Sequence, residues 1–180
     1  MPYAITLPLD SQAESKVVAM YAALASLNIS HDQIKLGYPP HITLAILDDA
    51  TKLRELNEVV SNVARSWQSL RLSFVGFGLF PGAPSTLWLC PVVTADLLQR
   101  HAALCAALPV SSLTNHYLPN RWVPHVTLAK DVTEPSAAFA AMEGLDLPTE
   151  ATFAEVNLIH FRPVKLICRL RLKTFDENHP

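Results

Sequence analysis

A short sequence that occurs twice constrains the fold of this chain more than any other feature. Residues 40–45 read PHITLA and residues 124–129 read PHVTLA, so five of the six positions are identical. The two histidines, His41 and His125, lie 84 positions apart in a chain of 180 residues. A repeat at about half the chain length indicates two similar halves, because internal repeats correspond to repeated structural units.

Each copy of the repeat predicts a β-strand with one polar and one apolar face. Side chains at i and i+2 of a strand leave the same face of the sheet. His41 therefore shares a face with Thr43, and His125 shares a face with Thr127. A lone histidine on an apolar strand is more often a hydrogen-bonded core residue than a catalyst, but packing gives no reason to keep an imidazole in both copies. We therefore expect the polar faces to line a groove.

The segments around the two copies predict a similar order of helices and strands in both halves. Apolar periodicity predicts helices near 11–27, 48–67, 95–108 and 135–143, and strands near 3–9, 42–47, 71–79, 86–93, 123–129, 152–161 and 165–175. Ser11 is a candidate N-cap of the first helix, with Glu14 at the spacing of a capping box.

This order of elements predicts an α+β fold that is bilobal and duplicated. Two antiparallel-rich sheets would face a central cleft, with helices packed outside them and pseudo-two-fold symmetry between the halves. We expect a single bilobal domain over residues 1–180, with repeat halves at roughly 1–80 and 85–175, because no flexible Gly/Ser linker separates them.

The composition is that of an ordered globular protein, with 50% hydrophobic and 17% charged residues. The formal net charge of −2 argues against binding of long duplex nucleic acid, but it allows one or two phosphates in a pocket. The three cysteines show neither disulfide nor metal-type spacing. No apolar stretch reaches the ~18 residues of a membrane span and no signal-peptide pattern is present, so we expect a cytoplasmic monomer without a membrane partner.

A pair of histidines with a pair of threonines suits chemistry at phosphorus. Because the unperturbed pKa of histidine is near 6.5, one ring can be neutral and accept a proton while the other is protonated and donates one. The threonine hydroxyls can donate hydrogen bonds to phosphate oxygens whose charge grows in the transition state. We therefore predict His41 and His125 as catalytic residues, and Thr43 and Thr127 as phosphate-binding residues.

Other catalytic motifs are absent from the sequence. It has no H-E-x-x-H zinc motif, no G-x-x-x-x-G-K phosphate loop and no G-x-S-x-G serine motif. A catalytic metal is the competing use of two histidines, although zinc hydrolases usually add a carboxylate or a third histidine. We expect neither a metal nor a cofactor.

The paired H-x-T motifs resemble those of the 2H phosphoesterase superfamily, specifically its bacterial 2′-5′ RNA ligase-like branch. Residues 74–92 are similar to the segment that this branch carries between its motifs, and residues 123–131 are similar to its second motif. The resemblance implies a bilobal α/β fold with pseudo-two-fold symmetry. It also implies hydrolysis of cyclic phosphodiesters, notably 2′,3′-cyclic phosphate ends of RNA, or the reverse joining to a 2′-5′ bond. By this resemblance the two histidines are the acid/base pair and the two threonines contact the phosphate.

Several basic and aromatic residues are candidates for substrate contact. They are Tyr38, Phe80, Trp88, Arg121, Trp122, Lys130, Arg169 and Arg171. The aromatic rings could stack on a base, and the basic side chains could follow a phosphate backbone. A core or rim position for the rings and a solvated strand face for Arg169 and Arg171 are the simpler interpretations. Lys130 stands where the family often has arginine.

The sequence therefore predicts a metal-independent phosphodiesterase that hydrolyses a cyclic phosphodiester by general acid–base catalysis at two histidines. The expected partner is a small cyclic nucleotide or an RNA terminus with a 2′,3′-cyclic phosphate, and reversible 2′-5′ RNA ligation is a further activity of such a site. The alternative is a non-catalytic RNA- or nucleotide-binding protein that keeps the cleft.

Overall fold

A computed structural model of the chain describes residues 2–48, 52–161 and 163–174. Its strands are β1 (Tyr3–Pro8), β2 (His41–Leu47), β3 (Leu70–Phe80), β4 (Ser85–Pro91), β5 (Val126–Val132), β6 (Glu150–Phe153), β7 (Glu155–His160) and β8 (Lys165–Arg171). They form one eight-stranded sheet in the order β6-β3-β4-β5-β2-β1-β7-β8, and every pair of neighbours is antiparallel. The predicted α+β class and antiparallel pairing are confirmed.

The two motif strands, β2 and β5, lie side by side at the centre of the sheet. One register pair, Ile42–Val126, joins them. Four strands lie on each side of this junction, and the motif strand is the innermost of each four. The two sheets expected from the sequence are therefore the two halves of one sheet. Without the pairing of β2 with β5, each motif strand would be an unpaired edge strand of its half.

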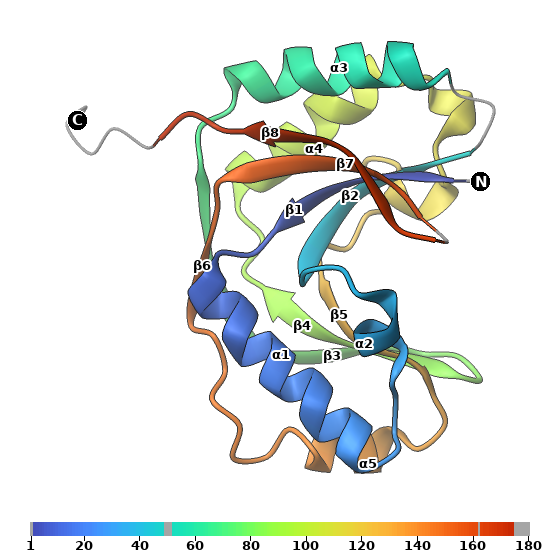
Figure 1. Cartoon of the computed structure of the whole chain (residues 1–180), viewed down its shortest axis with the longest axis vertical. Helices are drawn as coiled ribbons and strands as arrows, with labels where there is room; N and C mark the ends of the chain where they lie inside the picture. Colours follow the sequence, from blue (N-terminus) through green and yellow to red (C-terminus); the bar gives the residue numbers. More distant parts are fainter. Residues whose placement is uncertain (1, 49–51, 162, 175–180) are drawn as a thin grey trace.

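Helices pack on both halves of the sheet. They are α1 (Ser11–Ser26), α2 (Asp32–Leu36), α3 (Leu53–Ser66), α4 (Ala95–Ala107) and α5 (Pro135–Ala140), with two 3-10 turns, η1 (Val110–Ser112) and η2 (Asn115–Tyr117). Helices α3 and α4 lie against each other beside β7 and β8, whereas α1 and α5 lie against β4, β5 and β6 (Figure 1). Because α1 follows β1 but packs on the opposite half, each half of the sheet combines elements from both halves of the sequence. None of the described helices has both the length and the apolar character needed to cross a membrane.

The N-cap of α1 is Asp10. Its carboxylate accepts hydrogen bonds from the backbone N–H groups of Gln12 and Ala13, both at 3.0 Å. The prediction of Ser11 as the N-cap was therefore wrong, because the preceding aspartate already satisfies the free N–H groups of the first turn. The other Asp10 oxygen accepts a hydrogen bond from the backbone N–H of Thr152 at 2.5 Å, which ties the start of α1 to β6.

The strand expected near 152–161 is two strands in different halves of the sheet. Strand β6 pairs with β3, and after Ala154 the chain continues as β7, which pairs with β1. The prediction was wrong because an alternating pattern marks a strand without showing which partner it pairs with. The short helix α2 was not predicted either, since five residues are too few to display a helical period.

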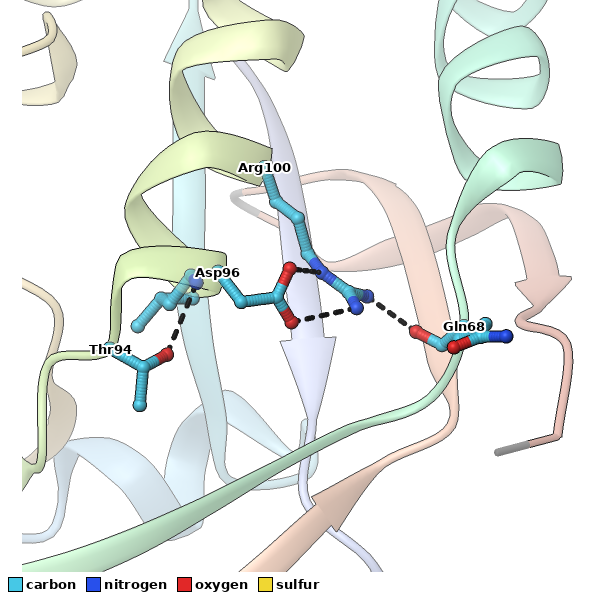
Figure 2. A network of polar contacts seen from close by, with 5 residues as sticks. Gln68, Thr94, Asp96 and Arg100 are labelled. Carbon is cyan, nitrogen blue, oxygen red and sulfur yellow. Dashed lines mark hydrogen bonds and ion pairs between the residues drawn. The ribbon is translucent and has the colours of Figure 1, made fainter. Parts of the chain in front are cut away.

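A polar network outside the central sheet fixes the position of α4 (Figure 2). Thr94 caps α4 by accepting a hydrogen bond from the backbone N–H of Leu97 at 3.2 Å. The Arg100 guanidinium donates to both carboxylate oxygens of Asp96, at 2.9 and 2.8 Å, and also to the backbone carbonyl of Gln68. Because a bidentate arginine–carboxylate pair fixes geometry as well as charge, this network ties α4 to the segment between α3 and β3.

Candidate active site

The same backbone hydrogen bond orients both motif histidines. Nδ1 of His41 lies 2.7 Å from the carbonyl oxygen of Pro39, and Nδ1 of His125 lies 2.8 Å from that of Val123. A carbonyl oxygen can only accept, so Nδ1 of each ring carries the proton. Nε2 of each neutral ring is then the unprotonated nitrogen, which is free to take up a proton.

A cleft with a volume of about 880 Å³ brings the four motif residues together. His41, Thr43, His125 and Thr127 all line it: His41 and Thr43 lie on β2, His125 directly precedes β5, and Thr127 lies on β5. The apolar residue between each histidine and its threonine is fully buried on the other face. The structure thus places the two polar pairs on one surface and the intervening residues in the core, as the alternation predicts.

A β-bulge occurs at the same place in both motif strands. In β2 the register with β1 shifts at Leu44, and in β5 the register with β4 shifts at Leu128. An extra residue on one strand reverses the alternation of the side chains beyond it. The next side chains that line the cleft are consequently Ile46 and Lys130. The repeat therefore fixes a third cleft position in each motif strand, and the two copies fill it with different residue types.

Large aromatic side chains hold the backbone of the motif threonines. The Trp122 indole N–H donates to the carbonyl of Thr43 at 3.0 Å, and the Tyr21 hydroxyl donates to the carbonyl of Thr127 at 3.2 Å. Trp122 is buried, and its ring stacks on His101 of α4 with 4.0 Å between centroids. Trp122 lines the cleft, but its one polar atom is used inside the protein. It is therefore placed to position Thr43.

Aromatic rings also flank the two histidines. Tyr38 lies edge-on to His41 with 4.9 Å between ring centroids. Phe80 lies edge-on to His125 at 4.9 Å, and Trp88 stacks on Phe80 at 4.9 Å. Phe80 lines the cleft, whereas Tyr38 and Trp88 lie outside its lining. These contacts restrict the orientation of both imidazoles, because a packed ring leaves each histidine fewer rotamers.

Burial lowers the pKa of both histidines. The pKa of His41 falls to about 4, mainly because burial disfavours the charged ring and also because of positive charge on His125 and Lys130. The pKa of His125 is also lowered by burial and by Lys130. In each case the hydrogen bond to the backbone carbonyl opposes the shift. Positive charge on His125 therefore disfavours a second proton on His41.

The basic candidates divide into two groups. Arg121 and Lys130 line the cleft. Arg169 and Arg171 lie on β8 at the edge of the sheet, outside the lining of the cleft, and the Arg169 guanidinium pairs with Glu155 at 3.3 Å. The cleft also contains residues that the sequence analysis did not single out, among them Asp32 and Lys35 of α2, His116 of η2 and Phe161 after β7. No motif marks these residues, since they lie outside the two copies of the repeat.

The side chains that line the cleft include hydrogen-bond donors that suit an anion. Protein metal sites of the zinc type use three or four ligands from histidine, cysteine and carboxylate side chains. Within the described ranges of the chain, no group of three or more such side chains is arranged to hold a metal. The cleft offers imidazoles, hydroxyls and ammonium groups, which can donate hydrogen bonds to phosphate oxygens, together with the carboxylates of Asp32 and Asp131.

The sheet thus brings two histidine–threonine pairs, one from each copy of the repeat, into one cleft. The family model described as the 2′-5′ RNA ligase superfamily matches residues 15–164. The chain therefore belongs to the 2′-5′ RNA ligase superfamily, within the 2H phosphoesterases, as its motifs predict. This membership supports a phosphodiesterase or RNA ligase-like activity, and hence an enzyme.

Solved structures share the fold over nearly the whole chain. TT0787 of Thermus thermophilus matches with a TM-score of 0.69 and 16% identity, over 98% of this chain and 100% of TT0787. LigT of E. coli in complex with NADP+ matches with a TM-score of 0.63 and 17% identity, over 95% of this chain and 96% of LigT. At such identities the likeness shows the fold alone. None of the curated proteins compared with this chain matches it significantly in sequence.

Proposed function

We propose that this protein is a metal-independent phosphodiesterase that hydrolyses a 2′,3′-cyclic phosphate of a nucleotide or an RNA end. One observation carries the proposal: two histidines line the same cleft, and each uses Nδ1 for an identical backbone hydrogen bond that leaves Nε2 free. Two such nitrogens, with Thr43 and Thr127 beside them, suit in-line attack at a phosphorus atom held between the rings. E. coli LigT, which shares the fold, has been solved with 3′-AMP, a nucleotide with a phosphate on the ribose.

The two histidines take different roles in the proposed hydrolysis. Neutral His41 accepts a proton from the attacking water through Nε2, and the water oxygen forms the new bond to phosphorus. Protonated His125 donates its Nε2 proton to the ribose oxygen as the P–O bond to that oxygen breaks. The threonine hydroxyls donate hydrogen bonds to the non-bridging oxygens, where negative charge grows. In ligation a 5′-hydroxyl replaces water as the nucleophile, and the two rings keep their roles. In the reverse reaction, which breaks the 2′-5′ bond and reforms the cyclic phosphate, the two rings exchange roles.

Turnover of a cyclic nucleotide in the presence of a chelator tests this proposal. Purified protein incubated with adenosine 2′,3′-cyclic phosphate and excess EDTA is expected to release a single adenosine monophosphate, separated by chromatography. Binding of the nucleotide without turnover would instead favour the non-catalytic nucleotide- or RNA-binding function. Loss of turnover in EDTA with recovery on addition of zinc would show that the histidines serve a metal.

The proposed roles predict an acidic optimum for kcat/KM. His41 must be neutral, so activity is lost as the pH falls through its pKa of about 4. His125 must be protonated, so activity is lost as the pH rises through its pKa, which burial lowers below the ordinary value near 6.5. The profile of kcat/KM against pH is therefore expected to be bell-shaped, with its maximum between these limits and a tenfold fall per pH unit above them. A maximum above pH 7 would contradict these roles.

A further inference from the structure

One wall of the cleft is apolar across three neighbouring strands. Ile46 of β2 pairs with Ala4 of β1, and Ala4 pairs with Ile159 of β7. All three side chains line the cleft, and Phe161 and Val164 continue the same wall beyond β7. This wall offers no hydrogen-bond donor from its side chains to a charged group, so it suits an uncharged part of a ligand such as a base.

The repeat places an equivalent row on the other half of the sheet, with different chemistry. Lys130 of β5 occupies the position of Ile46, because both follow the bulge in their motif strand. Thr86 of β4 lies beside the bulged segment of β5 that holds Lys130, and it pairs with Phe80 of β3. All three line the cleft. The two walls are therefore equivalent in backbone and different in side chains, one apolar and the other carrying an ammonium and a hydroxyl.

Helix α2 adds a second ammonium to the polar wall. Asp32 and Lys35 lie one turn apart on α2, and both line the cleft. The Asp32 carboxylate is occupied, since one oxygen accepts hydrogen bonds from the Gln33 side chain at 2.8 Å and from the backbone N–H of Lys130 at 3.2 Å. This contact anchors α2 on β5 and brings Lys35 to the same side of the cleft as Lys130.

Neither ammonium forms an ion pair with a carboxylate within the described part of the chain. The ion pairs found there involve other lysines and arginines, and none includes Lys35 or Lys130. Asp131, which follows Lys130 and also lines the cleft, forms no ion pair with either lysine in that part of the structure. Two unpaired cations on one wall of a cleft favour an anionic ligand group between them.

This cationic pair lies beyond the residues that hold the reacting phosphate. Lys130 is three residues after Thr127 on β5, beyond the bulge at Leu128. The cleft volume of about 880 Å³ also lies near the upper end of the range of about 300–1,000 Å³ that is usual for ligand sites. Both features indicate a ligand with a charged group next to the one between the histidines.

We propose that the cleft binds a nucleotide with a second phosphate in addition to the reacting cyclic phosphodiester, and that Lys130 and Lys35 bind this second phosphate. The inference rests on the proposed phosphodiesterase function and names its substrate class: a nucleoside 2′,3′-cyclic phosphate that also carries a 5′-phosphate. The apolar wall then faces the base, and the difference between the two walls gives the substrate one orientation in a cleft whose backbone is pseudo-symmetric.

Paired substrates test the second-phosphate subsite. The values of kcat/KM for adenosine 2′,3′-cyclic phosphate with and without a 5′-phosphate are compared, and the wild type is expected to prefer the 5′-phosphorylated substrate by about tenfold. Lys35→Gln and Lys130→Gln are each expected to reduce this preference to about one-third of its wild-type value or less. Lys173→Gln is the matched control, because it makes the same substitution at a lysine that does not line the cleft, and it should keep the ratio. Equal preference in the wild type, or an equal loss in the control, would overturn the subsite.

A binding measurement separates failure of this inference from failure of the proposed function. Titration calorimetry compares adenosine 3′,5′-bisphosphate with 3′-AMP, neither of which requires turnover. The bisphosphate is expected to bind more tightly than 3′-AMP, and Lys35→Gln and Lys130→Gln are expected to weaken its binding. If this is found while neither cyclic substrate is hydrolysed, the second-phosphate subsite is supported and the proposed phosphodiesterase function is not. If both cyclic substrates are hydrolysed but adenosine 3′,5′-bisphosphate and 3′-AMP bind equally well, the phosphodiesterase function is supported and the second-phosphate subsite is rejected.

Discussion

Asparagine in place of either motif histidine is expected to lower kcat/KM for a 2′,3′-cyclic nucleotide by about 10²–10⁴-fold. The asparagine amide N–H can occupy the position of Nδ1–H, so His41→Asn keeps the hydrogen bond to Pro39 and His125→Asn keeps the bond to Val123. What each variant lacks is Nε2, the nitrogen that accepts or donates the proton in the proposed mechanism. The loss is measured by steady-state kinetics, with thermal unfolding as a check on the fold.

A matched control comes from a histidine outside the cleft. Nδ1 of His160 lies 3.3 Å from the backbone carbonyl of Pro163, so His160→Asn makes the same substitution at a similar hydrogen bond. It should keep the wild-type kcat/KM, because His160 does not line the cleft. Retention of activity in His41→Asn or His125→Asn would remove that histidine from the mechanism.

The double variant distinguishes acid–base catalysis from two independent contributions to binding. If His41 and His125 act on one transition state, the second substitution should cost little once the first has been made, because residues that act as a unit are not additive. Two independent binding contributions would instead multiply. The kcat/KM of the double variant, compared with the product of the two single losses, decides between them.

The four motif residues could be predicted from the sequence because the relevant pattern is local. A histidine and a threonine two positions apart share a face of any regular strand, and the repeat shows that the pattern is not accidental. The position of Lys130 was a different matter. Its side chain lines the cleft because a bulge at Leu128 reverses the alternation, and nothing in the apolar pattern marks a bulge between two otherwise regular strand segments.

The contacts of the aromatic candidates could not be predicted from the local sequence pattern. Tyr38, Trp88 and Trp122 were predicted only as possible base-stacking residues, and their sequence positions close to the motifs do lie near the site. In the structure, however, each contacts a protein group: Tyr38 contacts His41, Trp88 contacts Phe80, and Trp122 contacts the Thr43 carbonyl. The partner of Trp122 lies 79 positions away, so the sequence around Trp122 does not identify it.

Alanine in place of Gly78 is expected to lower turnover by about 100-fold, although Gly78 does not line the cleft. Gly78 of β3 pairs with Trp88 of β4, and the indole lies directly over the glycine. A Cβ at position 78 would lie 2.8 Å from Cη2 of Trp88 and still closer to two other ring atoms. The indole must therefore move, because it cannot interpenetrate the new methyl group.

The displaced indole contacts His125 both directly and through Phe80. Trp88 stacks on Phe80, lies edge-on to His125 at 5.9 Å, and has no hydrogen-bond partner for its buried Nε1 among the described residues. Packing alone holds this ring, so a shift passes to Phe80 and to the imidazole that must align with phosphorus. Gly78→Ala should also lower the free energy of unfolding by about 1–3 kcal/mol, as overpacking does. Because phenylalanine lacks the clashing outer ring atoms, adding Trp88→Phe should restore stability and part of the turnover. Wild-type kinetics in Gly78→Ala would show that the position of His125 does not depend on this stack.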